Sequence, residues 1–245
     1  MRLFLLAIMF LFATSAGSPA QAACADAAIN IRAPGLAASD RKEFDAQFRR
    51  SLRRICRWWG ETFEGPFEIE IDESRGPAMA LVPAWRGKHG RILFRAGTVR
   101  LGRATITHEI VHVLAPNANR FLAEGLAVYA HETQRGQPAY PNFGRDLNSE
   151  ARKLVDHADL ATLERVATPT RLQTPDLDGR SAYIVAGSFV GFLIKERGLD
   201  KFRELYALTP LVAAKRNPGA PERWQAIYEV EFATLVAEWR AAIGK

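Results

Sequence analysis

The chain has 245 residues, of which 48% are hydrophobic and 24% are charged, and its formal net charge is +6. This composition provides for a sizeable core and contains no low-complexity segment. The positive charge is not accompanied by a nucleic-acid-binding motif, so nucleic acid is not expected as a partner.

Residues 1–22 have the pattern of a cleavable secretory signal peptide. Arg2 precedes an apolar run from Leu3 to Phe12, and Ala20-Gln21-Ala22 provides the small residues of a cleavage site. The run is too short to cross a bilayer as a helix, and no later segment is apolar for long enough. Cleavage after Ala22 would leave about 223 residues, enough for one large domain or two joined lobes, in the periplasm or outside the cell.

Cys24 and Cys56 are the only cysteines in the chain. In an oxidising compartment such a pair predicts one disulfide, which would hold the mature N-terminus to the first helix. Gln21 stands where a lipid-attachment signal has Leu or a similar apolar residue, so a lipid anchor on Cys24 is disfavoured. Neither cysteine is close enough in sequence to the metal motif described below to suggest a ligand.

The first predicted helix covers residues 40–60. Its apolar residues recur at helical spacing, at Phe44, Phe48, Leu52, Ile55 and Trp59. Five arginines on the same helix are expected to form a solvated face: Arg49, Arg50, Arg53, Arg54 and Arg57.

A small sheet is predicted ahead of the motif. Residues 67–71 alternate as a half-buried strand, and further apolar runs at 79–82 and 91–95 follow Gly-containing turns. His89 belongs to the turn before the last strand and is expected to be an exposed loop residue rather than a ligand.

The segment His108-Glu109-Ile110-Val111-His112 carries the clearest chemical signal. It lies in an apolar stretch, residues 103–114, that predicts a buried helix. Residues four apart share a helix face, so both imidazoles could bind one Zn²⁺, each about 2.0–2.1 Å away. Burying these polar groups is costly unless something satisfies them, which favours a metal site over a chance arrangement. The spacing is typical of a zinc-dependent peptidase, in which Glu109 would act as the general base.

A catalytic zinc site needs a third protein ligand and an open position. A metzincin would have Gly and His where Ala115 and Ala118 stand, so that ligand set is excluded. After a turn, a second apolar helix at 121–129 is predicted to fold back on the first. Glu124 in its middle is therefore the predicted third ligand of a His₂Glu site.

The remaining chain is predicted to be mainly helical. Loops are expected at 134–146, a candidate for the rim of a cleft, and at 168–180, with helices at 148–157, 181–197, 200–207 and 223–243. His131 lies about 10 Å beyond Glu124 along the helix axis, too far to share the metal. His131 and His157 are expected to be surface or internally satisfied histidines.

The two motifs together resemble the gluzincin metallopeptidases, specifically the short bacterial peptidase-MA-like domains. Those domains typically continue from His-Glu-x-x-His to a Trp-Leu-x-Glu-Gly-x-Ala segment. This chain continues to Phe121-Leu122-x-Glu124-Gly125-Leu126-Ala127-x-Tyr129, in which Phe121 replaces the usual Trp. The resemblance covers about residues 65–245 and is specific only in the two motifs.

The predicted fold is α+β, with a helix-and-sheet lobe at 23–100 and a mainly helical lobe at 101–245 that carries the zinc. The resemblance also implies a tyrosine that donates to the oxyanion, for which Tyr183 matches best, although Gly187 falls one position later than the pattern prefers. Thermolysin-like enzymes carry a ligand-orienting Asp where this chain has Val128, so no carboxylate is predicted to orient the histidines. The Gly-Ala-Met-Glu-Asn motif of aminopeptidases is absent, so their specificity is not expected.

The sequence thus predicts an exported zinc metallopeptidase acting on a peptide or protein substrate. Glu109 and Tyr183 would be catalytic, and His108, His112 and Glu124 would bind Zn²⁺. One alternative is a non-catalytic zinc-binding envelope protein, against which the intact Glu109 argues. Another is a metal-dependent amidase of cell-wall peptides, whose zinc chemistry would be the same. The oligomeric state and the choice between endo- and exopeptidase action are not predicted.

Overall fold

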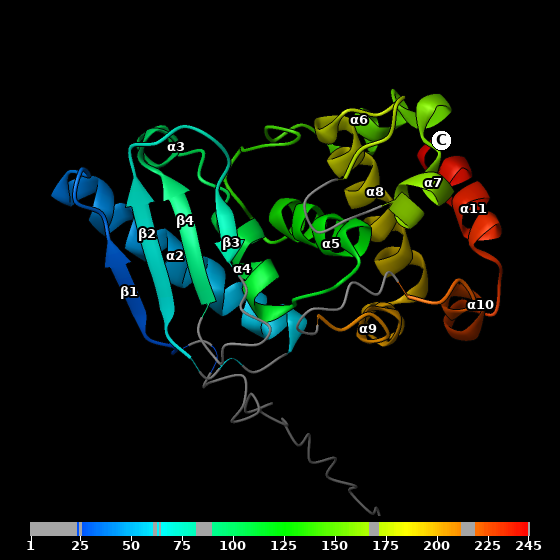
Figure 1. Cartoon of the computed structure of the whole chain (residues 1–245), viewed down its shortest axis with the longest axis horizontal. Coiled ribbons are helices and arrows are strands. Elements are labelled where there is room, and N and C mark those ends of the chain that lie inside the picture. The colour runs from blue at the N-terminus through cyan, green and yellow to red at the C-terminus, as the bar shows by residue number, and fades with distance from the viewer. Residues whose placement is uncertain are drawn as a thin grey trace, which may run out of the picture.

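The computed structural model describes residues 24, 26–60, 63, 65–81, 90–166, 172–211 and 219–244. Over these ranges the fold is mixed α/β, with a four-stranded sheet at one end and most of the helices at the other (Figure 1). The predicted signal peptide, its cleavage site and His89 lie outside the described residues.

The sheet has the strand order β1-β2-β4-β3. Its strands are β1 (Ile29–Arg32), β2 (Phe67–Asp72), β3 (Met79–Leu81) and β4 (Gly90–Arg95). The first three in this order are parallel, and β3 runs antiparallel to β4 at the edge. Strand β1 was not predicted because its four residues, two apolar ones alternating with two polar ones, form too short a pattern.

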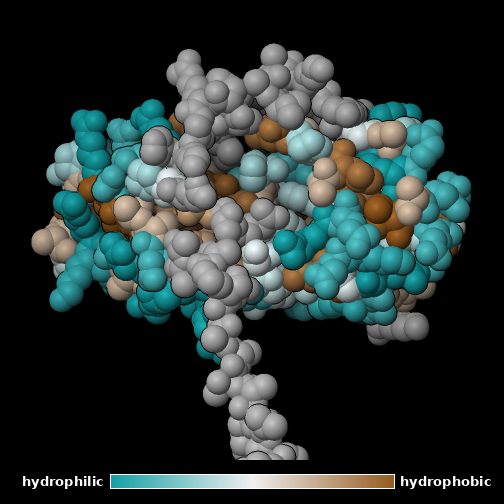
Figure 2. Space-filling view, turned by 90° about the horizontal axis from the view of Figure 1, so that it is seen from below, coloured by the Kyte–Doolittle hydropathy of each residue, from teal (hydrophilic) through white to brown (hydrophobic). Residues whose placement is uncertain are grey.

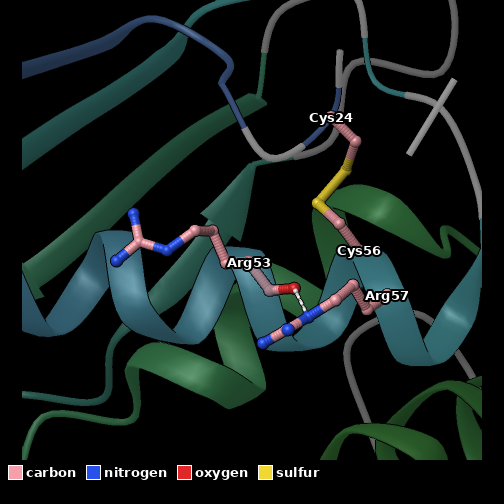
Figure 3. Close-up of a disulfide and its surroundings, with 4 residues drawn as sticks. All are labelled: Cys24, Arg53, Cys56 and Arg57. Atoms are coloured by element: carbon pink, nitrogen blue, oxygen red, sulfur yellow. Dashed lines mark hydrogen bonds between the residues drawn. A yellow bond between two sulfur atoms is a disulfide. The ribbon is translucent and has the colours of Figure 1, made fainter. Parts of the chain in front are cut away.

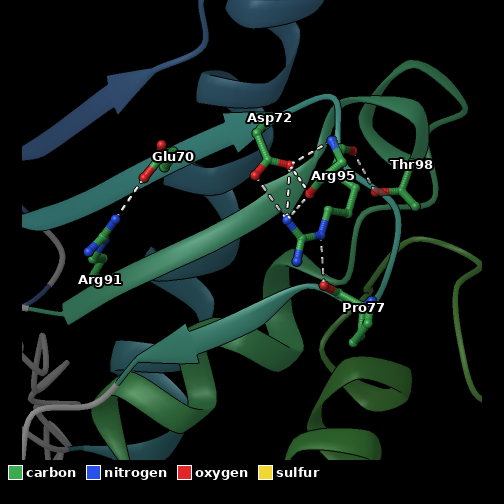
Figure 4. A network of polar contacts seen from close by, with 7 residues as sticks. Glu70, Asp72, Pro77, Arg91, Arg95 and Thr98 are labelled. Atoms are coloured by element: carbon green, nitrogen blue, oxygen red, sulfur yellow. Dashed lines mark hydrogen bonds and ion pairs between the residues drawn. The ribbon is translucent and has the colours of Figure 1, made fainter.

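The two faces of the sheet differ in polarity. In register, Ile69 lies beside Ile92 and Ile71 beside Phe94 on the buried face. The opposite face carries ion pairs, with Arg91 2.8 Å from Glu70 and Arg95 2.9 Å from Asp72 (Figure 4). Arg95 also donates to the carbonyl of Pro77, and so fastens the β2–β3 connection to β4.

Helix α2 (Ala38–Trp59) covers the apolar face of the sheet (Figure 1). The rings of Phe44 and Phe94 meet edge to face at 5.1 Å, and those of Phe48 and Phe67 at 5.3 Å. The predicted apolar stripe of this helix is buried, as expected. The helix ends at Gly60, whose φ of 80° gives the left-handed cap that glycine favours.

Cys24 and Cys56 form the predicted disulfide (Figure 3). Both cysteines are buried, and their Cα atoms are 5.9 Å apart. The bond ties residue 24 to the last turns of α2, beside the exposed Arg53 and Arg57.

Three helices at the centre of the fold contain most of the predicted site. They are α4 (Ile106–Leu114), α5 (Arg120–Thr133) and α8 (Gly179–Arg197), and α5 packs against both of the others. A Cβ at Gly125 would lie 2.7 Å from the carbonyl oxygen of Ala186, so glycine allows α5 and α8 to approach closely. Gly90 does the same for α4 and the sheet, since a Cβ there would collide with Val113.

The remaining helices surround this centre. They are α3 (Ala96–Arg100), α6 (Leu147–Arg152), the 3-10 helix η1 (Val155–His157), α7 (Leu160–Val166), α9 (Leu199–Ala207), α10 (Arg223–Tyr228) and α11 (Phe232–Gly244). The prediction of a single helix at 223–243 is wrong, because Glu229 adopts a left-handed conformation with φ 63° and ends α10. The helix predicted at 148–157 likewise divides into α6 and η1.

On the face seen from below, the two flanks are mostly hydrophilic, with hydrophobic residues in separate patches (Figure 2). Among the helices that the structure describes, none combines the length and the apolar character needed to cross a membrane.

Candidate metal centre

The first motif is buried because other elements surround helix α4. It packs against α2, α5 and the two strands at the β3 edge of the sheet. The hydroxyl of Thr107 donates to Ser51 on α2 over 3.2 Å, which fixes the rotation of α4 about its axis. His108 and Glu109 are buried, and the side chain of His112 is 17% exposed.

The turn before α5 brings the second motif back to the first. Asn119 caps the helix by accepting from the backbone N–H of Leu122 over 3.1 Å. The amide of Asn119 also donates to Glu164 over 2.9 Å, so the turn is anchored to α7. Glu124 therefore lies opposite the histidine pair, as predicted, and is 4% exposed.

Three side-chain atoms converge at this point. His108 Nε2 and His112 Nε2 are 3.1 Å apart, and they lie 3.1 Å and 3.2 Å from Glu124 Oε2. Ligand atoms about 2.0–2.1 Å from one tetrahedral ion are about 3.3 Å from one another, so this triangle matches the spacing of three zinc ligands. In the part of the chain that the structure describes, these residues form the group of donors that could hold a metal ion.

The charges of the three residues support one another. Although burial opposes its ionisation, the carboxylate of Glu124 raises the pKa of His112. Burial likewise opposes the charge of Glu124, but His112 and the hydrogen bonds of both imidazoles hold the pKa of this carboxyl well below its usual range. A divalent cation would satisfy the same ionised carboxylate and both imidazole nitrogens at once.

Arg120 is a part of the site that the sequence analysis missed. Its Nη2 lies 2.9 Å from Glu124 Oε1 and donates to the hydroxyl of Tyr183 over 2.6 Å. One carboxylate oxygen of Glu124 thus faces Arg120, and the other faces the histidines. Arg120 stands one residue before the helix predicted at 121–129, whereas the observed α5 begins at Arg120 and places it four residues from Glu124 on the same helix.

Tyr183 lies beside the metal centre, at the start of α8. Its ring is nearly parallel to that of His108, with 6.3 Å between the centroids and 12° between the planes. Burial raises the pKa of its hydroxyl, and the negative charge of Glu124 raises it further, so the side chain is a neutral phenol at pH 7.

Glu109 points to the N-terminal end of its own helix. The hydroxyl of Thr105 donates to Glu109 Oε1 over 3.0 Å and so restrains the carboxylate. The charge of Glu109 also contributes to raising the pKa of His112. Thr105 was not identified in the sequence as a contact of Glu109.

The other histidines do not join this group. His131 is buried on α5, where its Nε2 donates to the carbonyl of Gln137 over 2.6 Å and its Nδ1 has no hydrogen-bond partner among the described residues. Burial lowers the pKa of His131 to about 4. His157 is exposed in η1. His108 Nδ1 has no hydrogen-bond partner among the described residues.

No protein-family model, no curated protein and no solved structure matches this chain. The resemblance to gluzincins therefore rests on the two motifs alone.

Proposed function

We propose that this protein is an exported, zinc-dependent peptidase with a His₂Glu site. The observation that carries the proposal is the convergence of His108 Nε2, His112 Nε2 and Glu124 Oε2 within 3.1–3.2 Å, on two buried helices. Two imidazoles and a carboxylate are the ligand set of known catalytic zinc sites in peptidases, in which a fourth position stays open.

The residues around the ligands support hydrolysis rather than simple binding. When bound, Zn²⁺ would supply a Lewis acid for the scissile carbonyl and for water. Glu109 would take a proton from the attacking water and pass it to the leaving amine. A purely structural site has no need of such a base.

Tyr183 would donate a hydrogen bond from its hydroxyl to the developing oxyanion. Arg120 donates to the hydroxyl oxygen, and the phenol proton bonds to Glu124, so an oxyanion would take this proton's hydrogen bond in place of the carboxylate. The raised pKa of Tyr183 keeps that proton in place at neutral pH.

The disulfide between Cys24 and Cys56 favours an oxidising compartment, since such bonds persist there and are rare in reducing cytosol. This agrees with export to the periplasm or the medium. A metal-dependent amidase acting on cell-wall peptides would use the same residues in the same roles.

The test is cleavage of a peptide library by the purified protein, with Glu109→Gln as the matched control. Wild type should bind zinc and cleave, whereas Glu109→Gln should bind zinc but lose hydrolysis by several orders of magnitude, because an amide cannot accept the proton. Equal cleavage by both proteins, or zinc binding without cleavage of any peptide, would leave the non-catalytic alternative in place of this proposal.

A further inference from the structure

Two large aromatic side chains are exposed on the loop between α5 and α6. Tyr140 is 39% exposed and Phe143 is 48% exposed, and their rings meet edge to face with 6.3 Å between centroids. Large apolar side chains with this exposure are few among the described residues. Two such rings in contact form a surface for another apolar group. We call Tyr140 and Phe143 the aromatic platform.

The platform is held in place by the residues between and around its two rings. Pro141 and Asn142 are buried, so the loop turns its middle inward and its aromatic residues outward. Asn142 donates to the carbonyl of Arg145 over 2.6 Å, and the backbone N–H of Phe143 bonds to Ala139 over 2.7 Å. A buried interior and these hydrogen bonds fix the rings before any ligand arrives, which lowers the entropic cost of binding.

A second element braces the platform from the side of α8. Arg180 donates to the carbonyl of Pro141 over 2.9 Å, and its guanidinium carbon lies 5.9 Å from the centre of the Phe143 ring. The loop is therefore bound to the N-terminal turn of the helix that carries Tyr183.

The platform is continuous with the metal centre. The ring of Tyr140 packs edge to face on that of Tyr183, with 5.7 Å between centroids. Tyr183 in turn stacks on the imidazole of His108. If the carbonyl of a substrate reached the metal ligands, the side chain of Tyr183 would thus separate it from the aromatic platform.

We infer that the aromatic platform is a substrate subsite that takes an aromatic or large apolar side chain next to the scissile bond. This inference rests on the proposed peptidase function and adds a substrate class to it. Aromatic rings prefer edge-to-face and offset contacts with other rings, which Tyr140 and Phe143 both offer. A small or charged side chain would gain little from this surface, because it has less apolar area to bury there.

The kinetic test compares two peptide sets that differ only by Phe or Ala at each position around the cleaved bond. Wild type should cleave the best-placed Phe peptide about ten- to hundredfold better in kcat/KM than its Ala counterpart. Tyr140→Ala and Phe143→Ala should each remove most of this preference, so that the ratio of kcat/KM for the Phe peptide to that for its Ala counterpart approaches one. Tyr140→Phe should retain the preference because the ring remains. Leu101→Ala, at an exposed apolar residue on the cap of α3, is the control and should retain it too.

A binding test separates this inference from the proposed chemistry. Glu109→Gln, with zinc bound, is titrated calorimetrically with the same blocked Phe and Ala peptides, with and without Phe143→Ala. Tighter binding of Phe peptides that Phe143→Ala abolishes would support the subsite even if wild type cleaved nothing. Equal binding, or no binding of Phe peptides, would overturn it, as would an unchanged Phe preference in both platform variants.

The other molecule to test for binding to the aromatic platform is a second copy of the chain. Wild type and Phe143→Ala are sedimented over the same range of concentrations. A monomer in both cases supports the substrate role. A concentration-dependent dimer that Phe143→Ala loses would assign the platform to self-association and overturn the inference.

Discussion

Arg120 decides which oxygen of Glu124 is presented to the histidines. Because its guanidinium pairs with Oε1, the carboxylate offers Oε2 alone and would bind a metal through one oxygen. Arg120→Gln should weaken zinc affinity about 10- to 100-fold, the range found when a partner of a metal ligand is removed. Competition with a chromogenic chelator measures this. Arg49→Gln, which breaks an exposed ion pair with Asp45 on α2, is the control. Equal zinc affinity in wild type and Arg120→Gln would refute the role.

Glu124 itself is expected to be indispensable for the metal. Glu124→Ala removes one of three predicted protein ligands and should leave less than stoichiometric zinc in the purified protein. Elemental analysis measures the content, and circular dichroism shows whether the helices persist. A full equivalent of zinc in a folded Glu124→Ala protein would exclude the His₂Glu assignment.

Tyr183 tests the chemistry rather than the metal. Tyr183→Phe keeps the ring that stacks on His108 and removes only the hydroxyl. If this hydroxyl donates to the oxyanion, kcat should fall about 10²–10³-fold with little change in KM, because the bond forms mainly in the transition state. Steady-state kinetics on a cleaved peptide measures both constants. Unaltered kcat would remove Tyr183 from the mechanism and leave Tyr140 as the next donor to test.

At the scale of the elements, apolar periodicity in the sequence predicted the helices that depend on local interactions. The apolar periodicity of residues 103–114 and 121–129 located α4 and α5, and a helix period of about 3.6 placed His108 and His112 on one face. The ends of the helices were less accurate. Glu229 breaks the last predicted helix although Glu is a good helix former, so its left-handed backbone is a consequence of tertiary packing that the sequence pattern does not contain.

Contacts between distant segments account for what the sequence did not predict. Strand β1 exists because it pairs with β2, with Ile29 beside Phe67, and four residues alone carry no such signal. The aromatic platform likewise depends on Arg180, which bonds to the carbonyl of Pro141 although it lies 39 residues further along the chain. The 134–146 loop was expected to form a cleft rim, but nothing in its composition indicated that its two rings would lie outward or that Tyr140 would meet Tyr183.

The burial of His131 on α5 predicts that the stability of the fold falls in acid. His131 is neutral in the folded state because burial lowers its pKa to about 4 from an unfolded value of about 6.5. Above pH 6.5 the residue is neutral in both states and adds no pH dependence. As the pH falls from about 6.5 to 4, the unfolded chain binds the proton first, so this residue removes about 3 kcal/mol of stability.

His131→Gln should therefore flatten the fall in stability between pH 6.5 and 4, even if it lowers stability at neutral pH. Glutamine can still donate to the carbonyl of Gln137 but does not titrate. Urea unfolding of the metal-free proteins at several pH values gives the two slopes, and His157→Gln, at an exposed histidine, is the control. Parallel slopes for wild type and His131→Gln would show that the buried imidazole does not set the acid response.

At the scale of the whole molecule, one covalent bond joins the N-terminal segment to the layer that supports the metal centre. The disulfide closes a loop of 32 residues onto α2, and α2 carries Ser51, which bonds to Thr107 on α4. In the chain-entropy model, a loop of this length stabilises the fold by about 3–4 kcal/mol. Replacing both cysteines by alanine should lower the free energy of unfolding by about that amount.

The same double replacement should leave the metal centre intact. His108, His112 and Glu124 are held by α4, α5 and their turn, none of which includes Cys24 or Cys56. Urea unfolding should therefore shift to lower denaturant, while zinc content measured below the transition stays at one equivalent. Loss of zinc from the still-folded variant would show instead that the position of α4 depends on the disulfide through α2, and that the sheet lobe and the metal-binding helices behave as one cooperative unit.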